Sequence, residues 1–303
     1  MFDIHSFKRL SCPDVAYLRT RLAGAEHMTC ELSPLNLYVW GYTSETVWQE
    51  CNGHLYFHLR KEDMLLFADF GADARTPGPS ELAEASAALR AAGYGGKIWQ
   101  VRPAYLDAHP QTAEFFVPRL EDDAAAEYVY ETAALRDLTG EKLRKKRNLI
   151  KQFLKAHPEP VVKDVADGPV LEDCLSLAAE WRARQENPGT EALVREADAL
   201  GHLRDGFAAL GCEGVAVYTE EGLAAFCVYD RVNAEVFTES FEKSRFGVKG
   251  AAQFANHEMA KRLSGRARYI NREQDLGSEG LRHAKLSYDP AFLLKNDILV
   301  PRV

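Results

Sequence analysis

Residues 214–263, GVAVYTEEGLAAFCVYDRVNAEVFTESFEKSRFGVKGAAQFANHEMAKRL, decide the fold class. Three apolar runs separated by short polar turns predict three antiparallel strands, at 214–219, 223–230 and 234–241. A loop with two glycines follows at 245–251. Apolar residues then recur at helical spacing over 252–263, and this predicts a helix. The stretch therefore indicates an antiparallel sheet whose last strand leads through a glycine loop into a helix.

The flanking sequence completes the order of elements. Helical spacing predicts two helices before the strands, at 171–184 and 196–210. After the glycine loop and its helix we expect a short strand, a helix and a final strand or hairpin, at 268–271, 278–288 and 292–300. This order resembles that of a GNAT-type N-acyltransferase domain, in which the glycine loop binds the pyrophosphate of the acyl donor.

The first half of the chain repeats this order about 160 to 170 residues earlier. We expect a hairpin formed by strands at 53–59 and 63–70. A helix at 81–93, with Ser80 as its N-cap, and a strand at 97–101 follow. We therefore predict an α+β fold of two tandem GNAT-like domains, each a mixed, mainly antiparallel sheet flanked by helices. The predicted parts are an N-terminal domain at 1–134, a basic linker helix at 135–160, and a C-terminal domain with the donor site at 161–303.

Composition is that of an ordinary globular protein. The chain has 303 residues, 46% of them hydrophobic, and a net charge of −8. No C-x-x-C pair occurs among the six cysteines, and His54 and His58, although four residues apart, fall in a predicted strand and so do not share a helix face. We therefore expect buried thiols, no metal, no tightly bound cofactor and a cytoplasmic location. No run of 18 apolar residues is present, so no membrane span is expected.

The glycine loop is a candidate donor-binding site. Its candidate residues are Arg245, Gly247, Lys249, Gly250 and Ala251. Backbone N–H groups at a helix N-terminus can hold phosphate oxygens, and glycines leave them unshielded. The alternative is a plain strand-to-helix turn, which also needs glycine.

A dense polar cluster follows the predicted strand at 268–271, in the sequence NREQDLGSEGLRHAKLSYDP (271–290). Polar groups beside a core must find partners, so this density predicts a site. The predicted substrate-binding residues are Asn271, Glu273, Gln274 and Arg282.

Acyl transfer needs a base for the attacking group and an acid for the leaving group. The predicted catalytic residues are Glu239, Asp275, Lys285 and Tyr288. Two alternatives stay open: Glu239 as a solvated strand residue, and Lys285 as the ion-pair partner of Asp275 or Glu279.

The linker helix is strongly basic within an acidic protein. Arg144, Lys145, Lys146 and Arg147 are its candidate residues for binding nucleic acid or another anion. They favour tRNA or a lipid surface as partner, and the alternative is a solvated helix face.

Three segments resemble a group of bacterial proteins related to the C-terminal domain of phosphatidylglycerol lysyltransferases: 271–290, 145–155 (KKRNLIKQFLK) and 30–40 (CELSPLNLYVW). The resemblance implies a tandem GNAT-like fold. In the lysyltransferases, such a domain moves an aminoacyl group from aminoacyl-tRNA to a lipid glycerol. Lys285 partly matches the place of their catalytic lysine.

Two functions are consistent with the sequence. The first is an acyl- or aminoacyltransferase that uses aminoacyl-tRNA or an acyl-CoA as donor. Its acceptor would be an amine or hydroxyl, on a small molecule or a lipid headgroup. The second is a non-catalytic GNAT-like module that binds a small molecule or an anionic partner.

Overall fold

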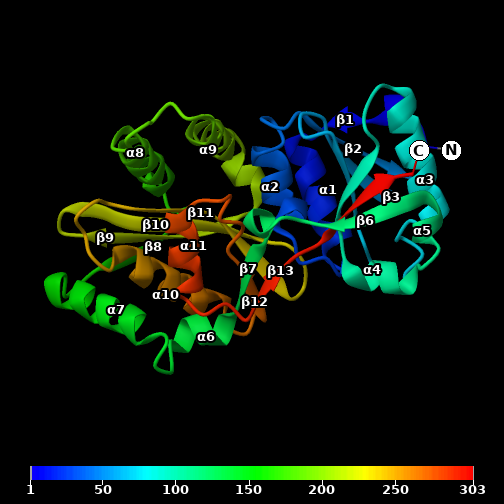
Figure 1. The fold of residues 1–303 in the computed structure, drawn as a ribbon. Coiled ribbons are helices and arrows are strands. Elements are labelled where there is room, and N and C mark those ends of the chain that lie inside the picture. The colour runs from blue at the N-terminus through cyan, green and yellow to red at the C-terminus, as the bar shows by residue number, and fades with distance from the viewer. Residues whose placement is uncertain (1, 303) are drawn as a thin grey trace.

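The computed structural model describes residues 2–302 and contains two seven-stranded sheets with helices packed against them (Figure 1). In spatial order the first sheet consists of β1 (Lys8–Arg9), β2 (Thr46–Cys51), β3 (His54–Leu59), β4 (Met64–Phe67), β5 (Lys97–Val101), β14 (Asp297–Pro301) and β6 (Phe116–Leu120). The β4–β5 pair is parallel and the other pairs are antiparallel. The predicted hairpin and the strand at 97–101 are therefore confirmed.

The second sheet has the same plan. In spatial order it consists of β8 (Val161–Asp164), β9 (Glu213–Thr219), β10 (Gly222–Arg231), β11 (Val236–Ser244), β12 (Tyr269–Asn271), β7 (Glu127–Glu131) and β13 (Phe292–Leu294). Here the parallel pair is β11–β12. Each sheet thus has one parallel pair, formed by the strands that precede and follow a helix. This is the predicted fold of two tandem GNAT-like domains.

The described α-helices are α1 (Cys12–Leu22), α2 (Pro34–Val39), α3 (Pro79–Ala91), α4 (Pro103–Ala108), α5 (Thr112–Phe115), α6 (Thr132–Asp137), α7 (Arg144–Ala156), α8 (Val170–Ala183), α9 (Glu191–Leu210), α10 (Ala251–Leu263) and α11 (Glu279–Leu286). In Figure 1, α8 and α9 lie on one side of the second sheet, and α6, α7 and α10 lie on the other. Separate apolar clusters form on these two faces.

The two sheets exchange strands. β14, at the end of the chain, lies between β5 and β6 in the first sheet, and β7 lies between β12 and β13 in the second. β7 precedes residue 134 but belongs to the second sheet, and β14 follows residue 160 but belongs to the first, so neither strand follows the predicted division into domains. The exchange is visible in Figure 1, where the chain crosses twice between the sheets. Each sheet is therefore completed by a segment from the other half of the sequence.

Three local predictions were wrong. Helix α3 begins at Pro79 with Gly78 as its N-cap, so Ser80 lies inside the first turn. The segment at 292–300 is two strands that join different sheets, because residues 295 and 296 carry the chain from one sheet to the other. The basic segment forms two helices, α6 and α7, because α6 ends at Leu138 with a left-handed φ of 49°.

The structure shows how the cysteines are buried and how long and apolar the helices are. Cys30, Cys174, Cys212 and Cys227 are buried thiols, and Cys12 and Cys51 are partly buried. Among residues 2–302, no helix combines the length and the apolar character needed to cross a membrane.

Strand β14 gives a test of the exchange. Leu299 is fully buried in the apolar cluster of the first sheet. We expect Leu299→Ala to lower the free energy of unfolding by about 2–5 kcal/mol, as for other buried leucines, measured by urea denaturation. Its neighbour Val300 is only partly buried, so Val300→Ala should cost clearly less. Equal, small losses for both variants would contradict the placement of β14 in the first core.

Candidate active site

The second sheet opens where β11 and β12 part. Their parallel pairing ends at Thr238 opposite Asn271. β11 continues to Ser244, whereas the segment after β12 turns at Glu273, whose φ of 60° lies in the left-handed region. A non-glycine residue in this region is uncommon and is held there by its surroundings. The opening is therefore a fixed feature of the fold.

A bulge in β11 turns two glutamates toward this opening. In the pairing with β10, Ser240 has no partner residue, whereas Glu239 and Phe241 on either side of it do. A bulge adds one residue to a strand and so shifts the alternation of side chains between its faces. Glu239 and Glu242 consequently face the same way, and both bind Arg272.

Arg272 is the centre of this cluster. Its side chain is 7% exposed, its Nε donates to Glu239 and its Nη2 donates to Glu242. Its guanidinium carbon lies 4.7 Å from the ring centroid of Tyr288 and 5.8 Å from that of Tyr130. Such a buried charge needs paired carboxylates, and the aromatic faces add a favourable cation–π contribution.

Several buried polar atoms of the cluster have no hydrogen-bond partner within the protein. They are Nη1 of Arg272, Oε1 of Glu239 and Oη of Tyr288. An unpaired buried polar group costs about 1–3 kcal/mol, so a cluster of them is unusual. Burial raises the pKa of Glu239, although the positive charge of Arg272 opposes this shift. The alternative that Glu239 is a solvated strand residue is wrong, because the residue is buried.

Lys285 comes from α11 and clamps the turn after β12. Its Nζ donates to the carbonyl oxygens of Arg272, at 2.5 Å, and Gln274. The predicted alternative, an ion pair with Asp275 or Glu279, is wrong. Burial lowers the pKa of Lys285. The ammonium group therefore lies against the backbone that carries Arg272 into the opening.

Asp275 anchors the other end of this turn. The carboxylate is fully buried and accepts hydrogen bonds from the Tyr128 hydroxyl at 2.6 Å, from Arg282 and from the backbone of Gly277. The Arg282 guanidinium is the main reason why the pKa of Asp275 falls to about 2. A carboxylate held ionised by these partners stabilises the turn and is poorly suited to act as a base.

The first half of the chain supplies one wall of the site. Asn271 donates to the carbonyl oxygen of Met28 at 2.9 Å and to the buried carboxylate of Glu127. Glu127 also accepts hydrogen bonds from the Thr29 hydroxyl and the Cys30 backbone. Burial raises the pKa of Glu127. The predicted residue Asn271 thus joins the two halves of the molecule.

The same wall holds the next two predicted binding residues. Glu273 accepts a hydrogen bond from Asn36 at 2.7 Å, and Gln274 donates to Glu31 at 3.2 Å. Burial raises the pKa of Glu273 to about 7 and that of Glu31 to about 8. Burial thus favours the protonated form of both carboxyl groups, and a cation placed beside them would favour the ionised form.

The basic helix α7 divides into inward and outward residues. Lys146 is buried, donates to the Ser287 hydroxyl at 2.7 Å and lies 3.7 Å from the Tyr288 ring centroid. Burial lowers its pKa to about 8, and the charge of Arg272 adds to this shift. Lys146 is thus part of the cluster around Arg272.

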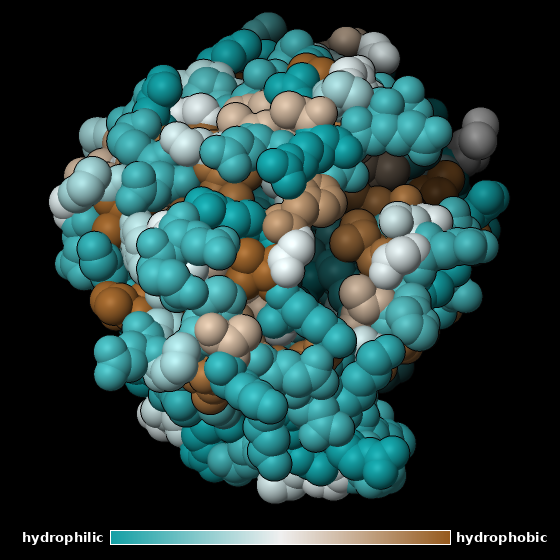
Figure 2. All heavy atoms as spheres, turned by 90° about the vertical axis from the view of Figure 1, so that its left-hand side faces the viewer, coloured by the Kyte–Doolittle hydropathy of each residue, from teal (hydrophilic) through white to brown (hydrophobic). Residues whose placement is uncertain are grey.

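Arg147 is half-buried and donates to the carbonyl oxygens of Leu138 and Gly140, in the loop before α7. Only Arg144 and Lys145 of the four predicted anion-binding residues are exposed. Hydrophilic residues cover most of the face shown in Figure 2, on the side of the molecule where α7 lies.

The glycine loop is explained in part by packing. Gly247 and Gly250 have φ values of 88° and 87°, which favour glycine. A Cβ at Gly250 would lie 2.3 Å from the carbonyl oxygen of Leu149 in α7, so α7 packs directly on the start of α10. Arg245 donates to the carbonyl oxygen of Glu221 at 2.8 Å. Of the other two predicted loop residues, Lys249 is exposed and Ala251 is buried.

Sequence reasoning did not select several residues of the site, among them Arg272, Glu242, Glu127, Glu31 and Asn36. Arg272 was visible inside the polar cluster and could have been chosen. Glu242 could not, because its orientation depends on the bulge at Ser240. Within residues 2–302, no group of three or more His, Cys, Asp or Glu side chains is arranged to hold a metal ion.

Fold and site together define a tandem GNAT-like protein with a buried polar cluster in its second domain. The chain belongs to the family described as phosphatidylglycerol lysyltransferase, C-terminal, whose model matches residues 26–295.

Individual relatives agree with this family. A crystal structure of a conserved protein of unknown function from Bacteroides thetaiotaomicron is 27% identical, with a TM-score of 0.88 over 98% of this chain and 99% of that one. The C-terminal domain of a putative lysylphosphatidylglycerol synthetase from Agrobacterium fabrum shares the fold, at 12% identity and a TM-score of 0.66 over 97% and 93%.

A further match is an uncharacterized protein of Mycoplasmoides gallisepticum, 25% identical over 179 residues. The match covers 57% of this chain and 55% of that protein, so the aligned part spans about half of the curated relative.

The raised pKa of Glu273 predicts a pH effect on stability. With a pKa of about 7, this carboxyl stays protonated up to about pH 7 in the folded protein, whereas in the unfolded chain it loses the proton near its ordinary pKa of 4.5. Stability contributed by this group is therefore present below pH 4.5 and is lost as the pH rises to 7. We expect Glu273→Gln to reduce the fall in unfolding free energy between pH 4.5 and 7. Glu45→Gln, at an exposed glutamate, is the control, and equal slopes in all three proteins would contradict the assignment.

Proposed function

We propose that this protein is an aminoacyltransferase that takes its aminoacyl group from aminoacyl-tRNA and passes it to an amine or hydroxyl acceptor. The observation that carries the proposal is the buried cluster of Arg272, Glu239 and Tyr288, which keeps polar atoms unpaired where β11 and β12 part. A bound substrate would supply the missing partners.

The unpaired atoms suit the three demands of acyl transfer. The acceptor attacks the ester carbonyl, its new bond to carbon forms, and Oε1 of Glu239 takes the proton. Nη1 of Arg272 stabilises the negative oxygen of the tetrahedral intermediate. The bond to the ribose oxygen of the tRNA then breaks, and the hydroxyl of Tyr288 protonates this oxygen. Transfer of the proton from Glu239 to Tyr288 restores the starting state.

Lys285 and Asp275 act in this proposal by position. Lys285 holds the backbone of Arg272 and Gln274, and Asp275 fixes the far end of the turn. Both therefore keep Arg272 in place and do not exchange protons with the substrate.

Two observations favour aminoacyl-tRNA over acyl-CoA as the donor. The start of α10, where a GNAT fold takes the pyrophosphate of CoA, is covered by α7 at Gly250 and Leu149. The buried carboxyl groups of Glu31 and Glu273 hold their protons up to about pH 8 and 7, and the ammonium group of an aminoacyl ester would favour their ionised form. The family description, which names a lysyltransferase, is consistent with this choice.

The isosteric variant Glu239→Gln tests the proposed chemistry. Charged tRNA with a labelled amino acid would be incubated with the protein and with amine and lipid acceptors, beside a parallel series with acyl-CoA thioesters. We expect Glu239→Gln to slow the transfer by about 10²–10⁴-fold, the usual contribution of a general base. The exposed control Glu221→Gln should behave as the wild type. Transfer from acyl-CoA alone would replace the proposed donor, and unchanged transfer by Glu239→Gln would remove the proposed base.

The exposed cations of α7 test the tRNA partner separately. We expect reversal of Arg144, Lys145 and Lys151 to glutamate to weaken tRNA binding and to lower its salt dependence by about one unit of slope per cation. The protein should stay folded, because these side chains are exposed.

A matched reversal of three exposed cations in the first domain, Lys8, Arg9 and Arg119, is the control. Filter binding at several salt concentrations measures both. Equal losses in the two variants would point to a general effect of net charge and would count against α7 as the binding surface.

A further inference from the structure

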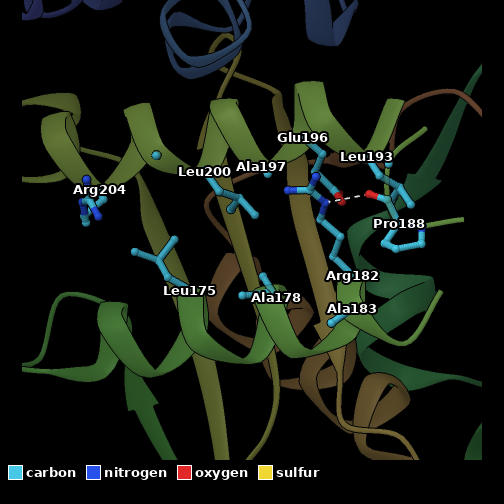
Figure 3. A pocket seen from close by; sticks show the side chains of 13 residues that line it. Leu175, Ala178, Arg182, Ala183, Pro188, Leu193, Glu196, Ala197, Leu200 and Arg204 are labelled. Carbon is cyan, nitrogen blue, oxygen red and sulfur yellow. Dashed lines mark hydrogen bonds between the residues drawn. The ribbon is translucent and has the colours of Figure 1, made fainter. Parts of the chain in front are cut away.

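Helices α8 and α9 enclose a groove of about 690 Å³, a volume typical of small-molecule sites. Figure 3 shows α9 above and α8 below, with apolar side chains between them and an arginine toward each end. The apolar lining includes Leu175, Ala178, Leu193, Ala197 and Leu200. The groove runs along about 12 Å of α8, from residue 175 to residue 183, at the rise of an α-helix.

Three charged residues line the groove, and one of them, Arg204, is paired with the neighbouring Asp205 at 3.1 Å. The other two are Arg182 and Glu196. Glu196 is neutralised by Lys243 of β11 at 2.6 Å. Arg182 is held by the carbonyl oxygen of Pro188 at 2.9 Å, so its guanidinium is fixed at one end of the groove (Figure 3). An anionic group is therefore the natural partner for this end.

Gly201 gives a second, independent indication. It lies inside α9, where glycine lowers helix stability relative to alanine, and a Cβ there would meet nothing within 4 Å. By contrast, a Cβ at Gly206 of the same helix would meet Tyr38 at 3.0 Å, so packing explains that glycine. Gly201 lines the groove and also the neighbouring hollow of about 600 Å³ beside Tyr42. Its missing side chain keeps this space open.

We propose that the groove binds the alkyl chain of a single-chain anionic amphiphile, with its carboxylate or phosphate at Arg182. The site is separate from the candidate active site. Lys243 faces α8 and α9, whereas the preceding residue Glu242 faces Arg272 on the other side of the sheet. The inference therefore does not depend on the proposed transfer reaction.

Calorimetric titration with dodecanoate, kept below its micelle concentration, tests the site directly. Gly201→Leu places a side chain in the groove, and it should weaken binding at least tenfold while the melting temperature stays the same or rises, because leucine favours a helix. Ala208→Leu, at an exposed position of the same helix, should bind as the wild type. Wild-type affinity in Gly201→Leu would overturn the proposal, as would an equal loss in Ala208→Leu.

The headgroup is tested with a second pair of measurements. Dodecylamine has the same chain and the opposite charge, and it should bind at least tenfold more weakly than dodecanoate. Arg182→Gln should remove this preference and leave a weaker, charge-independent affinity. Dodecyl phosphate beside dodecanoate shows which anion the site prefers, and tighter binding of either supports the proposal. Equal binding of the amine and the carboxylate by the wild type would overturn the role of Arg182.

Discussion

Arg272 brings a positive charge into the interior of the second domain, and Glu239 and Glu242 make its burial tolerable. Much of the local structure serves this contact. The bulge at Ser240 aligns the two carboxylates, the left-handed turn at Glu273 directs the chain into the opening, and Lys285 fixes the backbone carbonyl of Arg272. Removing one partner of a buried charge pair costs about 3–5 kcal/mol, so these features depend on one another.

The exchange of β7 and β14 makes the site a product of both halves. β7 carries Glu127 and Tyr128 beside β12, where they bind Asn271 and Asp275. The first half also provides Asn36 as a partner of Glu273. Neither half alone could hold the polar turn, because a buried carboxylate or amide without its partner would be strongly unfavourable. The crossing of the chain between the sheets is therefore a condition for the site.

The strands and helices that carry local periodicity could be predicted from the sequence. Residues 214–263 correctly indicated the GNAT-like order. The density of charge after β12 predicted a site, and Asn271, Arg272 and Asp275 are buried there. The exchange of strands could not be predicted, since β14 looks like the second strand of a local hairpin. The orientation of Glu242 depends on a one-residue bulge, which leaves no signal in hydrophobic alternation. The inward turn of Lys146 depends on how α7 packs against α10, which a run of basic residues does not reveal.

The first domain contains a counterpart of the ion pair between Glu239 and Arg272. Asp69 follows β4 and Arg102 follows β5, about 170 residues before Glu239 and Arg272. The two form an ion pair of 2.7 Å.

The remaining oxygen of Asp69 is used within the protein, because Oδ1 accepts hydrogen bonds from Gly71 and Thr76. In the second domain Oε1 of Glu239 has no such partner. A pair that only joins two strands gains from full satisfaction, as in the first domain. The oxygen left without a partner in the second domain therefore has no structural role that the first domain shares, and this difference is why the proposed reaction assigns the proton transfer to that atom.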